Sequence, residues 1–469
     1  MRDRALGVAG WVTAPTTTLH DAPDADPITA DRDLTNLDTQ AHTAPAAPTD
    51  TLVADKASTR EPVTAATVSA PVAPTGGAYL RFVLVVGALI AIGPLTIDTY
   101  LPALPSITRD LAASESAVQA TLTGILLGMG LGQLLVGPLA DAIGRRRPLI
   151  AGLALHIAAS VFTAFAPTIE LLTVGRVLQG LGNAAVAVVS MAMVRDLFQG
   201  SAAATMLSRL MLVMGLAPVL APTLGGAILQ ATSWRGVFLL IAGAGVVLVT
   251  IAALALRETL PVDRRRQLSV REVLSTYRTL LRDRTFVGLI LISGLMFATL
   301  FAYIGGSSFV LQDIYGLSVA QFGLAFGLNS LGFLTGSQLN PVLLKRFAPR
   351  QLVRFGVTVG ATAALVLLAA AATGIGGLTL VLVPLWFLLF ACGLTLPNTP
   401  ALALTRHGEA AGTAAALLGA AQFVIGGAAA PLIGAMGSDS AVPMAIVMAG
   451  TAVLAALVAT ATLRVRVVR

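Results

Sequence analysis

Runs of about 20 apolar residues recur along the chain from Leu80 onward, and short polar segments separate them. An α-helix rises 1.5 Å per residue, so each run is long enough to cross a hydrocarbon layer about 30 Å thick. The pattern predicts an all-α membrane protein with twelve transmembrane helices. Their expected spans are 80–103, 116–140, 148–167, 170–193, 204–230, 236–256, 285–310, 319–343, 351–372, 378–400, 410–435 and 441–462.

Two polar segments divide the chain. Residues 1–79 are rich in Ala, Thr, Pro and Asp and lack apolar periodicity, so we expect a disordered tail there. Residues 1–15 contain no apolar run of the kind that a signal peptide needs. The second polar segment, 257–284, separates six spans from six. We therefore expect an N-terminal six-helix bundle at 80–256, a linker at 257–284, and a C-terminal six-helix bundle with a short tail at 285–469.

The two halves contain matching segments. Residues 132–152 and 336–356 are both 21 residues long, and each joins the second and third spans of its half. When the two are aligned, Asp141 in the first lies opposite Lys345 in the second, so the second copy lacks the acid. Such a pattern is typical of parallel repeats related by an axis along the membrane normal.

Composition and charge support a membrane protein and predict its orientation. Only 11% of the residues are charged, whereas soluble domains have about 25%. Residues 1–79 carry 10 acidic and 5 basic residues, and the rest carries 13 acidic and 25 basic ones. Of those 25, 22 fall on one side of the predicted spans and two, Arg109 and Arg235, on the other. The first side, with both termini, is therefore expected to be cytoplasmic. The basic balance indicates contact with membrane lipid rather than nucleic acid.

The sequence does not predict an enzyme. The histidines, His20, His42, His156 and His407, are scattered, and the chain has no phosphate-binding loop and no paired catalytic acids. Cys392 is the single cysteine, which excludes an intramolecular disulfide and a cysteine-rich metal site. We therefore expect neither a metal nor an organic cofactor.

Two charged residues lie inside predicted spans, Asp98 in the first and Arg176 in the fourth. Asp98 is 17 positions beyond Arg81, and Arg176 is 19 positions before Arg195, which corresponds to about 26 and 28 Å along a helix. An ionisable residue inside the membrane indicates a functional site. We expect Asp98 and Arg176 to face each other or a common cavity. The alternatives are a purely structural ion pair, or an Asp98 that is solvated near the outer interface.

Other polar side chains within the spans are candidates to line such a cavity, although some of them are expected to bond across helices instead. The candidates are Tyr100, Gln133, Gln179, Asn183, Tyr303, Asn329, Asn398 and Gln422. The fifth span contains residues that bend a helix and allow close contact with a partner, namely Pro218, Pro222, Gly225 and Gly226. These residues predict either a bend where two halves rock or a kinked but static packing.

The segment 132–152 ends an apolar run with an acid, a glycine turn and three arginines, so it marks a membrane boundary. It resembles the loop motif G-x-L-x-D-x-x-G-R of the major facilitator superfamily, and the chain resembles that superfamily over nearly all of 80–465. The matching residues are Gly137, Leu139, Asp141, Gly144 and Arg145 for the loop motif, Arg176, Gln179 and Gly180 for the fourth-span motif R-x-x-Q-G, and 221–226 for the fifth-span antiporter motif. Ala142 departs from the loop motif, because many members have arginine there, and this removes one partner of the acid.

Finer detail resembles the bicyclomycin-resistance (Bcr/CflA) branch of drug:proton antiporters. The residues that carry this resemblance are PLTIDTYLPALP at 94–105, VRDLF at 194–198, the segments 303–312 and 321–329, and GTAAALLGAAQFVIGG at 412–427. Gly236 departs from the branch, because an aromatic residue often stands there.

The resemblance implies proton-driven export of small organic compounds, including antibiotics, across the inner membrane by alternating access. It implies a monomer that uses the proton as its coupling ion, with Asp98 and Arg176 as the coupling residues. It also implies a cytoplasmic latch that holds two bundles together and releases when the cavity opens. The latch candidates are Gly137, Asp141, Gly144, Arg145, Arg146 and Asp196.

Two alternatives stay open at this point. One is an importer or facilitator of a small metabolite, although the residues at 222–226 resemble those of exporters. The other is a membrane receptor or scaffold that does not transport, which would predict loss of the charges within the spans.

Overall fold

The structure, a computed structural model, describes residues 76–265, 269–407, 410–437 and 439–463. All of these belong to one unit of the chain, residues 68–469. The tail predicted at 1–79 lies outside the described residues up to position 75, and so does the end of the chain at 464–469.

The described residues form helices and no strands. The first half contains α1 (Gly76–Asp98), the short helix η1 (Leu101–Ala103), α2 (Leu104–Asp110), α3 (Glu115–Ile143), α4 (Arg146–Ala164), α5 (Ile169–Leu197), α6 (Gly200–Ala231) and α7 (Trp234–Ala255). The connection contains η2 (Val262–Arg264) and α8 (Val270–Leu280). The second half contains α9 (Arg284–Phe309), the π-helical turn η3 (Val310–Ile314), α10 (Val319–Leu343), α11 (Pro349–Thr373), α12 (Gly377–Leu404), α13 (Ala411–Gly427), α14 (Ala429–Ala435) and α15 (Val442–Thr462).

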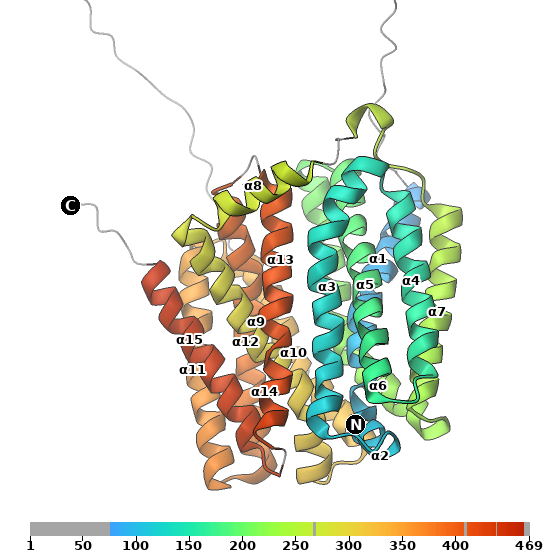
Figure 1. The fold of residues 1–469 in the computed structure, drawn as a ribbon. Coiled ribbons are helices and arrows are strands. Elements are labelled where there is room, and N and C mark those ends of the chain that lie inside the picture. The colour runs from blue at the N-terminus through green and yellow to red at the C-terminus, as the bar shows by residue number, and fades with distance from the viewer. Residues whose placement is uncertain (1–75, 266–268, 408–409, 438, 464–469) are drawn as a thin grey trace, which may run out of the picture. The chain divides into compact units, whose positions relative to one another are not determined.

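The spans predicted from hydrophobicity correspond to these helices. Eleven helical segments of the described chain are long and apolar enough to cross a membrane. The remaining predicted span is α10, which is less apolar because it carries Asn329 and Asn340 among other polar residues. α10 packs against α6 and α12. The predicted all-α membrane fold is confirmed, and the long helices run side by side along the bundle (Figure 1).

Side-chain caps explain where several helices begin. The hydroxyl of Ser114 accepts a hydrogen bond from the backbone N–H of Ala117 at the start of α3, at 3.2 Å. At the start of α10, Ser318 and Gln321 form a reciprocal capping box. Such caps satisfy backbone donors that the first turn of a helix leaves free, so the chain can leave and re-enter the bundle through short turns.

Glycines allow α3 and α5 to touch through their backbones. A Cβ added at Gly128 would overlap the carbonyl group of Val177, and one added at Gly180 would overlap that of Ile125. Lipid tails are as apolar as the helices, so close backbone packing of this kind holds helices together in a membrane. Gly124, Gly128 and Gly132 of α3 are four residues apart, and each lies against α5, so this repeat serves packing.

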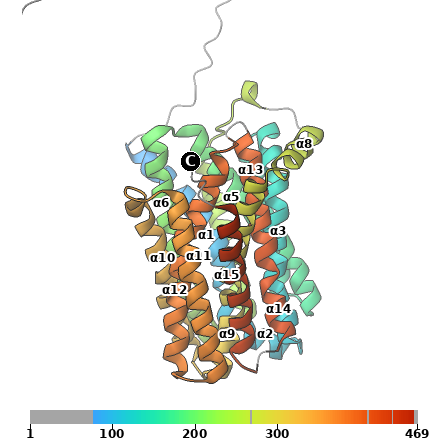
Figure 2. The same ribbon diagram turned by 90° about the vertical axis from the view of Figure 1, so that its left-hand side faces the viewer.

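The structure contains two helices that the sequence analysis did not predict. α2 continues the chain after the first span, and α8 lies within the segment expected to be a plain linker. α8 crosses one end of the bundle and packs against α13 (Figures 1 and 2). Leu280 of α8 is buried, whereas Leu274 is 59% exposed. We call the end with Arg145–Arg147 and α8 the arginine-rich end, and the end with η1 and α2 the opposite end.

The buried apolar residues form two clusters that show how the halves meet. One cluster lies within the first half near the arginine-rich end and includes Phe82, Leu149 and Val194. The other joins the opposite end of the first half, for example Leu104 and Trp234, to the core of the second half. Within the described residues, the two halves therefore share a continuous apolar core at the opposite end, and the first half has a separate core at the arginine-rich end.

The contact between α3 and α5 gives a direct test of the packing. Gly128→Ala should lower the thermal unfolding midpoint by several degrees, because overpacking a close contact costs about 1–3 kcal/mol. Gly243→Ala is the matched control, since nothing lies within 4 Å of a Cβ added there. The measurement is the unfolding midpoint of the detergent-solubilised protein. Equal midpoints for both variants would contradict the backbone contact.

Candidate functional site

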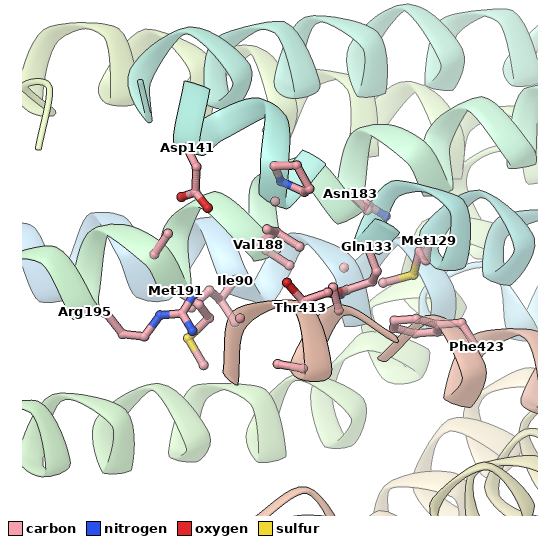
Figure 3. Close-up of a pocket in the computed structure, with 18 of the residues that line it drawn as sticks. Ile90, Met129, Gln133, Asp141, Asn183, Val188, Met191, Arg195, Thr413 and Phe423 are labelled. Atoms are coloured by element: carbon pink, nitrogen blue, oxygen red, sulfur yellow. The ribbon is translucent and has the colours of Figure 1, made fainter. Parts of the chain in front are cut away.

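A cavity lies between the two halves and extends toward the arginine-rich end. It consists of two connected parts of about 490 Å³ and 610 Å³. They share the lining residues Gly93, Pro94, Met129, Gln133, Met214 and Phe423. The first part reaches Asp141 and Tyr277 at the arginine-rich end, and the second reaches Asp98 deeper in the bundle. Figure 3 shows Gln133, Asn183 and Thr413 around the first part, contributed by α3, α5 and α13.

The deeper part of the cavity is lined largely by apolar side chains, and six aromatic rings are among them. The rings of Phe297 and Phe423 meet edge to face with centroids 5.4 Å apart. Tyr303 stacks on Phe326 with ring centroids 4.9 Å apart. Rings and apolar side chains make such a cavity suited to bind part of an apolar organic molecule.

Asp98 is the acid in this deeper part. It is the last residue of α1, is 3% exposed, and lines the cavity beside Ile97 and Tyr303. No ion pair or hydrogen bond of its carboxyl group is found within the described part of the chain. An unpaired charge is costly in surroundings of this kind.

Arg176 lies at the same level as Asp98 but does not pair with it. Its Nη1 donates hydrogen bonds to the carbonyl of Thr96, at 3.1 Å, and to Oε1 of Gln179, at 2.8 Å. Its guanidinium lies over the ring of Tyr100, 4.1 Å from the centroid. Arg176 is fully buried and is not among the residues that line the cavity. The expectation that Asp98 and Arg176 face each other or a common cavity is therefore wrong, because the rotation of α5 directs the arginine toward Tyr100. The coupling roles of both residues stay predictions.

The polar candidates divide into two groups. Four of the eight, Gln133, Asn183, Tyr303 and Gln422, line the cavity. The other four, Tyr100, Gln179, Asn329 and Asn398, are buried elsewhere among the helices. Tyr100 lies under Arg176, Gln179 donates to the hydroxyl of Ser160 at 2.7 Å, and Asn398 donates to Asn340 at 2.6 Å. Tyr100, Gln179 and Asn398 thus bond inside the protein, as expected for some of the candidates, whereas the Nδ2 of Asn329 has no hydrogen-bond partner within the described residues. None of the four lines either part of the cavity, so a cavity role for them finds no support in this structure.

Arg145 is the centre of a charged cluster at the arginine-rich end. Its side chain pairs with Asp141 of α3 and with Asp196 of α5, the latter at 3.0 Å. The hydroxyl of Thr259 also donates to Asp196, at 2.9 Å. Asp141 and Arg145 both line the first part of the cavity. The cluster therefore lies at the mouth of the cavity.

Glu258, which follows α7 at the start of the linker, also binds to this cluster. Its carboxylate accepts hydrogen bonds from the backbone N–H groups of Arg145, at 2.7 Å, and Arg146, at 3.1 Å. Partial burial alone would raise the pKa of Glu258, but hydrogen bonds from three backbone N–H groups and the charge of Arg265 hold that pKa below its usual value. A carboxylate at the start of α4 also interacts favourably with the helix dipole.

The turn between α3 and α4 requires glycine at position 144. Its φ angle of +98° is one that residues with a side chain rarely adopt. A Cβ there would also come within 2.6 Å of the carboxylate of Glu258. Gly137, by contrast, lines the cavity and has nothing within 4 Å of an added Cβ.

The latch residues do not hold the two halves together in this structure. All partners found for Arg145, Arg146 and Asp196 in the described chain belong to the first half or to the start of the linker. The expected contact between bundles is therefore absent from the described contacts, because the cavity lies open between this cluster and the second half.

The fifth-span residues lie where α6 meets the rest of the molecule. α6 runs as one helix through Pro218 and Pro222. A Cβ at Gly225 would overlap the carbonyl of Thr99, and one at Gly226 would lie 3.2 Å from Val319 of α10. α6 therefore contacts both its own half and the second half at close range.

Residues 84–431 match the family described as Major Facilitator Superfamily. The chain belongs to the major facilitator superfamily. It is 39% identical over 390 residues to the uncharacterized MFS-type transporter YdgK of Bacillus subtilis (strain 168), covering 82% of this chain and 96% of that one. It is 29% identical to a bicyclomycin resistance protein homolog of Haemophilus influenzae, covering 80% of this chain and 94% of the homolog. The multidrug resistance protein MdtL of Escherichia fergusonii is 33% identical and covers 58% of this chain and 69% of its own. These relatives confirm the predicted branch.

Two solved transporter structures with low sequence identity share the fold. A partially occluded inward-open structure of the xylose transporter XylE from E. coli has a TM-score of 0.64 at 16% identity, with 81% of this chain and 96% of that chain covered. The nucleoside transporter NupG has a TM-score of 0.66 at 12% identity, with 82% and 99% covered. Both likenesses concern the fold alone.

Two features of this superfamily member were missed by the sequence analysis. Glu258 was counted with the linker, although an acid directly after a span and among arginines is a signal for a counter-ion. Tyr277 of α8 lines the cavity mouth, and its spacing from Leu280 and Val273 is that of one helix face. The linker was expected only to connect the two bundles, but it also contributes a residue to the lining of the cavity.

The link between Glu258 and the Gly144 turn predicts a pH-dependent contribution to stability. Glu258→Ala should lower the unfolding free energy by less than about 1 kcal/mol, because the residue is only partly buried and solvent weakens its interactions. Folding lowers the pKa of Glu258 below its ordinary value of 4.5. The stability difference between the variant and wild type should therefore be complete above pH 4.5 and be lost as the pH falls through the lower pKa of the folded state. Melting curves at several pH values measure this, with the exposed Asp263→Ala as control. A difference that persists at low pH would contradict the proposed bonds.

Proposed function

We propose that this protein is a proton-coupled exporter of drugs or other small organic compounds that works by alternating access. The observation that carries the proposal is the carboxyl group of Asp98, which lines a largely apolar cavity between two halves and has no ion-pair partner among the described residues. A carboxyl group in such a place can hold a proton, or it can interact with the polar part of a substrate. Competition between the two for one site is a simple basis for exchange.

The shape of the cavity supports alternating access. The continuous apolar core closes the opposite end, and the cavity reaches the mouth formed by Asp141, Arg145 and Tyr277. Basic residues concentrate at this mouth, so we infer that it faces the cytoplasm and that both termini lie there. On this basis the structure is the state that accepts substrate from the cytoplasm or the membrane, and the inner membrane is its location.

The relatives support export rather than uptake. A homolog named for bicyclomycin resistance and one named for multidrug resistance both match this chain. We infer that small organic compounds are the substrates, that the proton is the coupling ion without any further cofactor, and that the transporter is a monomer surrounded by lipid.

Other charged residues take supporting roles in this proposal. Arg176 holds α5 to the backbone of α1 two residues before Asp98, so movement of either helix is transmitted to the acid. The Arg145 cluster keeps α3, α5 and the linker together while the mouth is open. A latch to the second half is then a feature of the opposite conformation.

Asp98→Asn gives the sharpest test of proton coupling. In energised everted vesicles, substrate-induced proton release should fall to background, because an amide group does not bind and release a proton near neutral pH. The measurement is the collapse of the pH gradient on addition of drugs from a broad panel. Asp263→Asn, on the exposed linker, should behave as wild type. Unchanged proton release in Asp98→Asn would remove Asp98 as the proton carrier.

Asp141→Lys tests the role of the cluster at the mouth, and it copies the lysine found in the second repeat. Turnover should fall roughly fivefold, which corresponds to the loss of an ion pair of about 1 kcal/mol, while the apparent substrate affinity stays near wild type. Transport rates at several substrate concentrations separate the two effects. Weaker affinity with normal turnover would show that the cluster binds substrate instead.

A further inference from the structure

The two halves are connected by side-chain hydrogen bonds at the opposite end. The hydroxyl of Ser308, near the end of α9, donates to the backbone carbonyl of Leu101 in η1 at 2.7 Å. The amide of Gln312 donates to the hydroxyl oxygen of Ser308 at 2.7 Å and reaches the carbonyl of Pro102 at 3.5 Å. Ser308 is fully buried. Neither Ser308 nor Gln312 lines the cavity or belongs to the Arg145 cluster.

The carbonyl of Leu101 is available for a specific reason. In a regular α-helix it would accept a hydrogen bond from the residue four positions later, but that residue is Pro105, which has no N–H. Instead, the carbonyl of Leu101 accepts a hydrogen bond from the N–H of Leu104 in the tighter turn of η1. A carbonyl oxygen has two lone pairs, so it can also accept the hydroxyl of Ser308 from the second half.

The second half presents this donor at an irregular point in its own helix. Directly after Phe309, α9 changes into the π-helical turn η3. Such turns occur mostly as single interruptions and often at functional sites. Because Gln312 donates to the oxygen of Ser308, the hydroxyl hydrogen is left to point at Leu101. Bonds arranged in a chain of this kind strengthen one another.

The same short segment of the first half carries both the acid and this contact. Asp98 ends α1, Thr99 lies against Gly225 of α6, and Leu101 accepts the bond from Ser308. The Ser308–Leu101 bond and the acid in the cavity are therefore connected through four residues of backbone, 98–101. Opening the opposite end requires η1 to leave α9, and this breaks the Ser308–Leu101 bond.

We propose that Ser308 and Gln312 form an outer latch, which holds α9 against η1 and keeps the end of the cavity opposite to the arginines closed. Ser308 supplies the bond between η1 and α9, which is separate from the bond that Thr123 of α3 donates to the carbonyl of Gly427 at 2.6 Å. Gln312 is a positioning residue that directs the hydroxyl of Ser308 toward Leu101. The inference rests on the alternating access in the proposed function, but its test needs neither a substrate nor a proton gradient.

The test measures how often the opposite end opens. The lone Cys392 is replaced by alanine, and Ala430→Cys on α14 serves as the reporter, since Ala430 is 2% exposed and lies against Gly305 at the junction with α3. A membrane-impermeant maleimide is applied from the side of the opposite end. Ser308→Ala and Gln312→Glu should each raise the labelling rate about threefold, the value expected for one hydrogen bond inside a membrane protein. A glutamate that is ionised cannot donate to Ser308.

Two controls make the outcome decisive. Ser307→Ala changes the neighbouring, equally buried serine, whose hydroxyl has no hydrogen-bond partner within the described residues, and it should leave the rate unchanged. Ser308→Thr keeps the hydroxyl and should retain slow labelling. If Ser308→Ala does not fold, Gln312→Glu still tests the latch on a partly exposed side chain. Equal acceleration by Ser307→Ala, or no acceleration by either latch variant, would overturn the proposal. A drug panel without proton release would sink the proposed function and leave the labelling result standing.

Discussion

The continuous apolar core at the opposite end is the constraint on which the rest of the structure depends. It joins η1, α2 and the start of α3 to α9 and α14, so the two halves are fixed to each other there. At the arginine-rich end the first half has its own core, and the cavity can extend between the halves. The depth of the cavity, the burial of Asp98 and the position of its mouth all follow from this asymmetry.

Both halves pair charges at the arginine-rich end, but they use different elements. In the first half, Arg145 in the turn between α3 and α4 pairs with Asp196 at the end of α5. In the second half, Asp283 before α9 forms an ion pair with Arg406 after α12, at 3.3 Å, and a hydrogen bond with His407, at 3.1 Å. Partial burial would raise the pKa of Asp283, but hydrogen bonds from backbone N–H groups and from these two side chains hold it low. The absence of the acid at Lys345 is thus accompanied by a different ion pair, which attaches the end of the linker.

Much of the fold could be predicted from the sequence, because a helix that crosses a membrane needs a long apolar run and a polar end. The side chains at the site were harder to place. Asp98 and Arg176 were expected at one level, and the bond from Arg176 to Thr96 does put them there. Their directions depend on the rotation of each helix and on the ring of Tyr100, which residue spacing does not contain. α8 and Glu258 were missed because charged residues dominate the linker and obscure its apolar face.

The polarity of α10 has a consequence for how the chain is assembled. α10 is less apolar than the other spans, and Asn340 finds its hydrogen-bond partner, Asn398, on α12, which is synthesised later. Until α12 arrives, α10 must rely on α6, which it also contacts. The final position of this polar helix is therefore completed only after α12 has been added, and α6 of the first half is the neighbour that is available before then.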